Sequence, residues 1–273
     1  MEKHILIIGD VVGNVGMRAL ESGLTHLKEK YNACLVIANG ENAADGFGLT
    51  EALAKQMFAS GVDVITSGNH IWEKSDFLDY LNTENRILRP ANYNNLKQHD
   101  VYGLKLSGNG FIKIEKDGVQ FLIINLQGRQ NMFSIDCPFK CFDSIYSEHA
   151  DQKIITIVDF HAELSSEKEA LAFYVDGRST VVVGTHTHTQ TADEKILKNG
   201  TAYITDIGMT GVLESVIGMD RDVCIKRSMN TVLYKMQCAE GAPSIQGVHV
   251  TVCSENCISL AIDRFSFNTD NIV

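Results

Sequence analysis

Val181-Val182-Val183-Gly184-Thr185-His186-Thr187-His188-Thr189 is the stretch around which the rest of the chain is organised. The three valines predict a buried strand, and the two histidines follow at its end. In an extended segment residues i and i+2 lie on one face, so His186 and His188 could share one metal ion or serve two adjacent ions. A polar loop in which two histidines happen to be close would have the same sequence. The interpretation therefore depends on what the other strand ends carry.

Apolar runs of the same kind recur through the first two thirds of the chain, and each ends in polar residues. These runs are His4 to Ile8, Ala33 to Ala38, Val62 to Thr66, Lys153 to Val158 and Thr180 to Val183. The helices expected between them run from about Asn14 (as N-cap) to Lys30, Thr50 to Ser60 closed by Gly61, Glu73 to Tyr80, and from a Ser166–Glu169 capping box to Val175. Continuous apolar strands that alternate with helices indicate a largely parallel sheet covered on both faces.

The other segments predict loops and hairpins. Residues Ile87 to Leu106 read as a loop, and Asp117-Gly118 joins Phe111–Glu115 to Val119–Asn125 in a hairpin. The irregular stretch Gln127 to Phe142 is a candidate cap or lid over a site. A second hairpin, Gly247–Cys253 with Cys257–Phe265, is expected to help build a second, more antiparallel sheet packed on the first. A single domain over residues 1–273 is the simplest organisation, because the chain holds no repeat or low-complexity tract.

Composition narrows the class of protein. The net charge of -10, from 34 acidic and 24 basic residues, argues against strong non-specific nucleic-acid binding, although an acidic protein can hold a phosphate through bound metal. The apolar run after Met1 is too short for a secretory signal, and no segment reaches the ~18 apolar residues of a membrane span, so we expect a cytoplasmic protein without a membrane partner. Seven cysteines without a C-x-x-C pair disfavour disulfides and a thiolate zinc site, and we expect reduced, mostly buried thiols.

Five apolar runs end in a potential metal ligand or proton carrier. These residues are Asp10, Glu41 with Asn42, Asn69 with His70, His161, and His186 with His188. Each alone has an ordinary explanation as a helix cap, a turn residue or a satisfied polar residue at a strand end. Ligands in open α/β sheets bind outside the carboxyl ends of the strands, and neighbouring strands lie only ~4.8 Å apart. The coincidence of five such ends therefore favours one shared pocket.

The donor types indicate the chemistry of that pocket. Carboxylate, amide oxygen and imidazole donors without thiolate suit a catalytic site for iron, manganese or zinc. A structural zinc site would normally contain cysteine. The donors are too many for one tetrahedral ion, and Glu41 is the best candidate to bridge two ions because of its longer side chain. Two ions ~3.5 to 4 Å apart can hold a hydroxide for in-line attack at phosphorus. The sequence therefore predicts hydrolysis of a phosphoester.

Several of these motifs resemble those of a known family. Gly9-Asp10, Gly40-Glu41-Asn42, Gly68-Asn69-His70, His161 and Gly184–His188 resemble the ordered motifs of the calcineurin-like metallophosphoesterases. Gly9–Gly13, Gly40–Ala44, Gly68–Trp72 and Thr185–Asp193 more closely resemble the YmdB family. Val12 stands where the wider superfamily has a histidine, and Glu41 replaces its bridging aspartate. Both departures match the narrower family.

The resemblance implies a fold, a ligand set and an activity. The implied fold is α/β, with two packed mixed β-sheets flanked by helices in a four-layer αββα sandwich. The implied ligands are Asp10, Glu41, Asn42 and His188 for one ion, and Glu41, Asn69, His161 and His186 for the other. His70 would act as general acid, a role in which an unbound imidazole beside a metal ligand is chemically reasonable. The implied activity is hydrolysis of 2',3'-cyclic nucleotides with two divalent or mixed-valence ions, iron first and manganese or zinc as alternatives, in a homo-oligomer.

Three other interpretations stay open at this point. A broader phosphomonoesterase or phosphoprotein phosphatase would use the same metals and prefer monoesters. A regulatory metal- or nucleotide-binding protein, such as an RNA-turnover partner, would bind metal with little turnover. A structural α/β domain would bind no transition metal.

Overall fold

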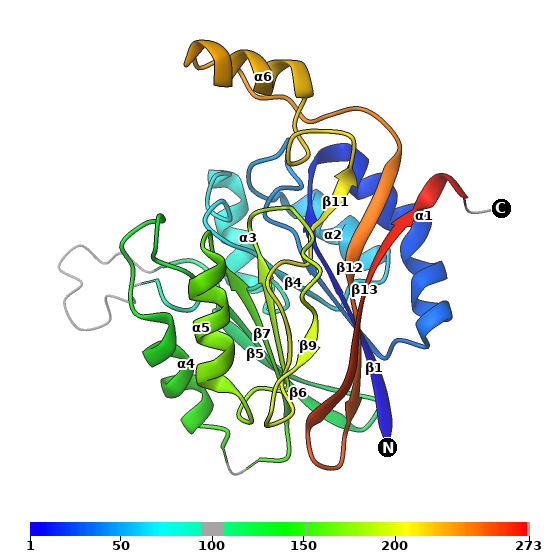
Figure 1. Ribbon diagram of the computed structural model, residues 1–273, viewed down its shortest axis with the longest axis vertical. Coiled ribbons are helices and arrows are strands. Elements are labelled where there is room, and N and C mark those ends of the chain that lie inside the picture. Colours follow the sequence, from blue (N-terminus) through cyan, green and yellow to red (C-terminus); the bar gives the residue numbers. More distant parts are fainter. Residues whose placement is uncertain (94–105, 151, 272–273) are drawn as a thin grey trace.

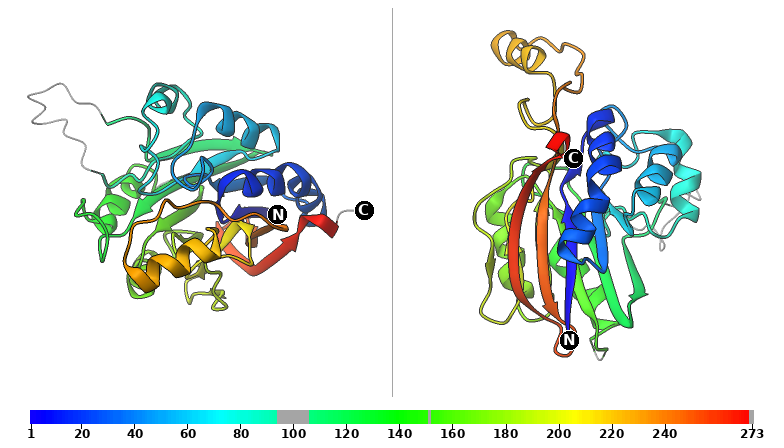
Figure 2. Two further views of the ribbon diagram at one scale, coloured as in Figure 1. Left: turned by 90° about the horizontal axis from the view of Figure 1, so that it is seen from above. Right: turned by 90° about the vertical axis from the view of Figure 1, so that its right-hand side faces the viewer.

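Two β-sheets pack face to face and helices cover the outer face of each (Figures 1 and 2). This is seen in a computed structural model that describes residues 1–93, 106–150 and 152–271. The fold class predicted from the sequence, two packed mixed sheets flanked by helices, is confirmed.

The first sheet contains seven strands with the N-terminal strand near its centre. Its order is β2 (Asp10–Val11), β11 (Met209–Val212), β12 (Pro243–Cys253), β1 (Glu2–Ile8), β3 (Leu35–Asn39) and β4 (Val64–Thr66), with β13 (Ile258–Asn268) paired to β12. Strands β1, β3 and β4 are parallel, whereas β12 runs antiparallel to β1 from Glu2↔Cys253 to Ile8↔Gly247.

The second sheet contains six strands. Its order is β5 (Phe111–Lys116), β6 (Val119–Gln127), β7 (Ile155–His161), β8 (Val181–Thr185), β10 (Ala202–Ile204) and β9 (Lys195–Ile196). The four central strands are parallel, and β5 and β9 close the edges in the antiparallel sense. The β5–β6 hairpin turns at Asp117-Gly118 as predicted, and both residues have positive φ.

The assignment of strands to sheets differs from the prediction in two respects. The prediction that the C-terminal hairpin β12–β13 helps to build the second sheet is wrong, because this hairpin completes the first sheet beside β1. The single parallel sheet expected for all upstream strands is also divided between the two sheets. An apolar run such as Ile5–Ile8 indicates a strand in the middle of a sheet, but it does not indicate which strand pairs with it.

Alternation along the strands forms the core and sets the position of the polar residues. Ile5 and Ile7 point between the sheets, whereas Leu6 and Ile8 pack under the helices of the first sheet. The same period of two continues in β7, where Ile155 and Ile157 lie in the core between the sheets. His161 therefore shares the inner face of β7, at its carboxyl end.

The helices form the outer layers. Helices α1 (Gly13–Tyr31), α2 (Glu51–Ala59) and α3 (Leu78–Thr83), with the 3₁₀ turn η1 (Ser75–Phe77), cover the first sheet, and α4 (Pro138–Ser147) and α5 (Ser165–Val175) cover the second. Helix α6 (Arg221–Asn230) stands away from both sheets (Figures 1 and 2). A short 3₁₀ turn, η2 (Thr269–Asn271), follows β13.

The N-caps of two helices differ from the prediction. Asn14 is not the N-cap of α1, because the helix follows Val12 and the Gly13 N–H donates to the Asn42 carbonyl at 3.0 Å. The predicted capping box of α5 is also absent: the N-cap position is Leu164, whose side chain accepts no hydrogen bond. The carboxylate of Glu167, the third residue of α5, instead accepts the N–H groups of Arg129 and Gln130 at 3.0 and 3.1 Å. A tertiary acceptor therefore replaces the local cap of α1, whereas at α5 the Glu167 side chain holds a neighbouring loop and does not cap the helix. The helix predicted from Glu73 begins two residues later, as η1.

Three further expectations concern loops, thiols and membranes. Within the predicted loop Ile87–Leu106, residues 94–105 lie outside the described residues. The candidate lid Gln127–Phe142 begins in β6 and ends in α4, and its intervening loop is tied to α5 through Glu167. All seven cysteines are free thiols, but only Cys34 and Cys224 are buried, so the expectation that most are buried is wrong. Among the described helices, none combines the length and apolarity of a membrane span.

Candidate metal centre

The structure brings the predicted site residues together at one end of the core between the sheets. Asp10 lies in β2, and His161 is the last residue of β7. The other residues lie in the segments that follow strands: Glu41 and Asn42 after β3, Asn69 and His70 after β4, and His186 and His188 after β8. Both sheets therefore contribute residues to the same end of the molecule.

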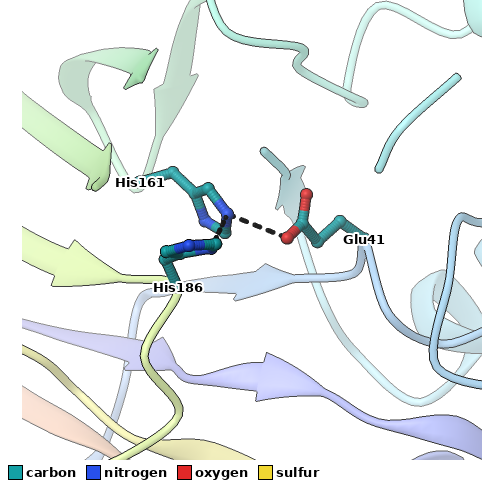
Figure 3. Close-up of side chains that lie close together, drawn as sticks. All are labelled: Glu41, His161 and His186. Atoms are coloured by element: carbon teal, nitrogen blue, oxygen red, sulfur yellow. Dashed lines mark hydrogen bonds and ion pairs between the residues drawn. The ribbon is translucent and has the colours of Figure 1, made fainter. Parts of the chain in front are cut away.

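His161 is the centre of a tight group of donors (Figure 3). Its Nε2 atom lies 2.9 Å from Glu41 Oε1 and 3.0 Å from His186 Nδ1. Asn69 Oδ1 is 3.2 Å from the same nitrogen. The ligand atoms of Glu41, His161 and His186 all lie within 4.8 Å of one another, which is a spacing that one metal ion can span.

Asp10, Asn42 and His188 form a looser group beside the first. His188 Nε2 is 3.7 Å from Asp10 Oδ1 and 3.0 Å from Asn42 Nδ2. His188 Nδ1 lies 2.8 Å from the Ile217 carbonyl, which can only accept, so Nδ1 carries the proton and Nε2 keeps its lone pair. Asp10 Oδ1 is also 4.0 Å from His161 Nδ1, so the two groups adjoin.

Two buried carboxylate oxygens in this site are poorly satisfied. Asp10 Oδ1 accepts no hydrogen bond from any residue that the structure describes, and Glu41 Oε1 meets only the ring nitrogen of His161, in the 2.9 Å ion pair. An unsatisfied buried polar group costs about 1 to 3 kcal/mol, and more when it is charged. A divalent cation satisfies such oxygens, and the surrounding nitrogen and oxygen donors suit one. The residues present therefore fit bound metal ions.

The electrostatics of the site favour positive charge between Glu41 and His161. Burial raises the pKa of Asp10 to about 6. Burial alone would lower the pKa of His161, but the carboxylates of Glu41 and Asp10 raise it to about 9. Burial, together with the charge of His161, lowers the pKa of His186 to about 3. A metal ion would compete with the proton of His161 for the same lone pair.

A hydrogen-bond chain fixes the ring of His161 from behind. The Thr185 hydroxyl donates to Asp159 Oδ1 at 2.7 Å, so its oxygen accepts from His161 Nδ1 at 3.0 Å. This arrangement puts the proton on Nδ1 and leaves Nε2 directed at Glu41. Asp159 is itself buried, and the hydroxyl of Thr66 also donates to it. The sequence does not single out Asp159 or Thr185 as supports of His161, although both lie on the inner faces of their strands.

The His186-Thr187-His188 turn is held by a buried ion pair. Lys168 Nζ lies 2.8 Å from Asp206 Oδ2, and both side chains are 1% exposed. The same Asp206 oxygen accepts the backbone N–H and the hydroxyl of Thr187, at 3.2 and 2.7 Å. No local sequence signal pointed to this pair, because its members are far apart in the chain.

The two histidines do not share a strand face. Strand β8 ends at Thr185, and His186 and His188 have φ of 98° and 61°, in the left-handed region that side chains other than glycine rarely adopt. His186 turns toward His161, and His188 turns toward Asn42. The expectation from strand periodicity is therefore wrong, although the two imidazoles do reach adjacent groups. Such backbone strain costs about 1 to 3 kcal/mol per residue, which explains why the turn needs Asp206.

His70 lies beside the donors without joining them. Its backbone N–H donates to Glu41 Oε2 at 3.0 Å, and its Nδ1 is 3.4 Å from Glu73 Oε1. The side chain is 26% exposed, and its ring meets the Phe47 ring edge-on at 5.1 Å. With Nδ1 directed at Glu73, Nε2 remains available to a ligand.

Comparison with known proteins supports a common origin along almost the whole chain. The model of the YmdB-like protein family matches residues 6–265. The chain is 41% identical over 269 residues to a Bacillus subtilis (strain 168) protein named 2',3'-cyclic-nucleotide 2'-phosphodiesterase, with 98% of each chain covered. A crystal structure of a phosphatase from Mycoplasma pneumoniae has a TM-score of 0.90 and 31% identity, covering 98% of this chain and 94% of that chain.

A more distant structure shares only the fold. The 5'-nucleotidase precursor from Thermus thermophilus has a TM-score of 0.58 and 15% identity, covering 98% of this chain and 54% of that chain. The extent of the family match and the 41% identity to a relative of the same length show that this chain belongs to the YmdB-like protein family.

Proposed function

We propose that the protein is a metal-dependent phosphodiesterase that hydrolyses 2',3'-cyclic nucleotides. The observation that carries this proposal is the cluster of Glu41, His161 and His186 ligand atoms at one end of the core, beside a buried oxygen of Asp10 that accepts no hydrogen bond from the described residues. The Bacillus subtilis relative, 41% identical, bears the name of this activity.

Two metal ions would be shared between two groups of residues. Asp10, Glu41, Asn42 and His188 would hold one ion, and Glu41, Asn69, His161 and His186 would hold the other. When bound, such ions acidify water and neutralise the charge on phosphate oxygens. Oxygen and nitrogen donors fit iron first, with manganese and zinc as alternatives.

The side chains around these ligands have separate tasks. The Thr185 hydroxyl keeps the His161 ring in the tautomer whose Nε2 faces the site. The His70 backbone N–H holds the second oxygen of Glu41, which leaves Oε1 for a ligand. The His70 imidazole, oriented by Glu73, donates a proton to the departing ribose oxygen. The product is the 3'-phosphate when that oxygen is O2'.

A substrate panel tests this proposal against the phosphatase alternative. Protein loaded with iron or manganese is given a 2',3'-cyclic nucleotide, a 3'-nucleoside monophosphate and a phosphoserine peptide at equal concentration. We expect the cyclic diester to be hydrolysed with the highest kcat/KM and the product to carry a 3'-phosphate. Faster hydrolysis of either monoester would overturn the assignment in favour of a phosphomonoesterase. Metal binding without turnover of any substrate would indicate a regulatory protein.

We also propose that the chain assembles as a homo-oligomer through α6 and the segment that follows it, which together form a projecting arm (residues 221–238) (Figure 1). Ile225, Met229 and Leu233 are 46%, 78% and 83% exposed on this arm. Clustered exposed apolar side chains are typical of a protein interface.

A further inference from the structure

A cavity of about 750 Å³ lies between the arm and the loop that follows Asn42. Its lining includes Phe47, Lys74, Arg227, Tyr234 and Lys235. The volume is within the range of about 300 to 1,000 Å³ typical of small-molecule sites. None of the residues assigned to metal or to proton transfer lines this cavity, so it needs an explanation of its own.

The cavity adjoins the candidate general acid. Phe47 lines the cavity, and its ring lies 5.1 Å from the ring of His70. Lys74 follows Glu73, whose carboxylate is 3.4 Å from His70 Nδ1. A proton donor to the departing ribose oxygen must touch the sugar of the substrate. The remainder of a nucleotide bound there would therefore extend past Phe47 and into the cavity.

The charge of the cavity wall differs from that of the whole chain. Lys74, Arg227 and Lys235 face it in a protein of net charge -10. In the described part of the chain, none of these three cationic groups has a carboxylate oxygen within 4.0 Å, the limiting distance of an ion pair. The lining also contains two acidic residues, Asp45 and Glu240, of which Glu240 pairs with Arg18 at 3.7 Å, so the three cationic groups outnumber the carboxylates. Unpaired cations beside a phosphoester site favour an anionic ligand such as a phosphate.

The wall also offers two aromatic faces on a preformed backbone. Phe47 and Tyr234 are 36% and 38% exposed. The Phe47 loop is closed by hydrogen bonds from Gly46 N to the Asn42 carbonyl and from Ala44 N to the Gly48 carbonyl, both at 3.0 Å. On the other side Arg227 Nη1 donates to the Tyr234 carbonyl at 2.6 Å, which ties α6 to the segment that follows it in the arm. Exposed aromatic rings next to cations are the usual features of single-stranded RNA recognition.

We propose that this cavity binds the nucleotides at the 3' end of an RNA whose last residue carries the 2',3'-cyclic phosphate. The inference rests on the proposed function and names its substrate class as an oligoribonucleotide end. The terminal nucleoside would lie against Phe47, and the phosphate on its 5' side would lie among Arg227, Lys235 and Lys74. The protein would contact only the 3' end of the RNA, which is compatible with an acidic protein that does not bind nucleic acid non-specifically.

The test compares a cyclic mononucleotide with a trinucleotide that ends in the same 2',3'-cyclic phosphate. For the wild-type protein we expect a KM about tenfold lower for the trinucleotide, as a few partly exposed charge contacts would give. Replacing both cations of the arm, Arg227→Ala with Lys235→Ala, should abolish this difference between the two substrates. Lys226→Ala removes the same charge from the neighbouring position, outside the cavity lining, and should keep the difference.

Two results would overturn the inference while the proposed function stands: equal KM for both substrates in the wild type, or an unchanged preference in the double variant. If the wild type hydrolyses neither substrate, the proposed function fails. In that case, binding of a labelled trinucleotide ending in 3'-phosphate, measured for the wild type and the double variant, still tests whether the cavity binds RNA. Equal binding by the wild type and the double variant would then refute it, and weaker binding by the double variant alone would support it.

Discussion

At the scale of single residues, Thr185 connects the buried carboxylate of Asp159 to the ring of His161. We expect Thr185→Val to keep the shape of the side chain but to remove the hydroxyl that accepts from His161 Nδ1, so that the tautomer of His161 is no longer fixed. Loss of such an indirect partner typically reduces metal affinity or activity by about 10- to 100-fold. Titration of the metal-free protein with manganese measures this change.

Thr156→Val is the matched control for that variant. Thr156 is 1% exposed on β7, and its hydroxyl has no hydrogen-bond partner among the described residues. We expect its replacement by valine to leave metal affinity unchanged. Equal affinities for the wild type and Thr185→Val would show that the hydroxyl does not position His161.

His70 gives a second prediction at this scale. His70→Gln should lower kcat for a 2',3'-cyclic nucleotide by about 100- to 10,000-fold, because the departing oxygen loses its proton donor. Metal content should not change, because His70 is not among the proposed ligands. A nitrophenyl diester has a leaving group that needs little protonation, so its hydrolysis should fall much less. An equal loss on both substrates would assign His70 a role other than general acid.

The residues of the site could be predicted from the sequence only where they end a strand. Asp10, Glu41, Asn69 and His161 follow apolar runs, and the structure places them together as parallel strand ends require. Asp159 comes directly after the run Lys153 to Val158 but still lies inside β7, and the sequence gives no sign that its carboxylate supports His161 two residues later. Its partner Thr185 comes from a neighbouring strand, and such pairing depends on register.

At the scale of elements, the turn after β8 depends on the ion pair between α5 and the segment after β10. Asp206→Asn would keep an acceptor for Thr187 but leave Lys168 as a buried charge without its carboxylate. Breaking a buried pair in this way costs about 3 to 5 kcal/mol of unfolding free energy. Urea unfolding of the metal-free protein measures the loss.

The adjacent residue on α5 provides the comparison. Glu169 pairs with Lys195 at 2.9 Å, and both side chains are more than a third exposed. Glu169→Gln should therefore cost about 1 kcal/mol or less. A cost for Asp206→Asn as small as that of Glu169→Gln would mean that the buried pair does not support the turn.

The elements themselves were easier to predict than their partners. The hairpin at Asp117-Gly118 and the two long C-terminal strands follow local signals, and both are present. The sheet that contains β12 could not be predicted, because an antiparallel neighbour of β1 can come from any distant segment. The caps of α1 and α5 were also missed, because Asn42 reaches α1 through its backbone carbonyl and Leu164 has no side-chain acceptor.

At the scale of the whole molecule, the arm predicts the state of assembly. Light scattering should show the wild-type protein as an oligomer, and Met229→Asp with Leu233→Asp should shift it toward the monomer. Both side chains are more than three quarters exposed in the isolated chain, so the charges should not disturb folding. Asn230→Asp, an added charge at a polar position of the same helix, should leave the oligomer intact. A monomeric wild type would contradict the assignment of the arm to an interface.

The central claim is that Glu41 is shared by two metal ions that support hydrolysis of a cyclic phosphodiester. Its most direct test is the metal content and the rate of 2',3'-cyclic nucleotide hydrolysis of wild type and Glu41→Gln, purified without oxygen. We predict two ions per chain and turnover in the wild type, and loss of metal together with loss of turnover in Glu41→Gln. A Glu41→Gln protein with full activity would contradict the claim.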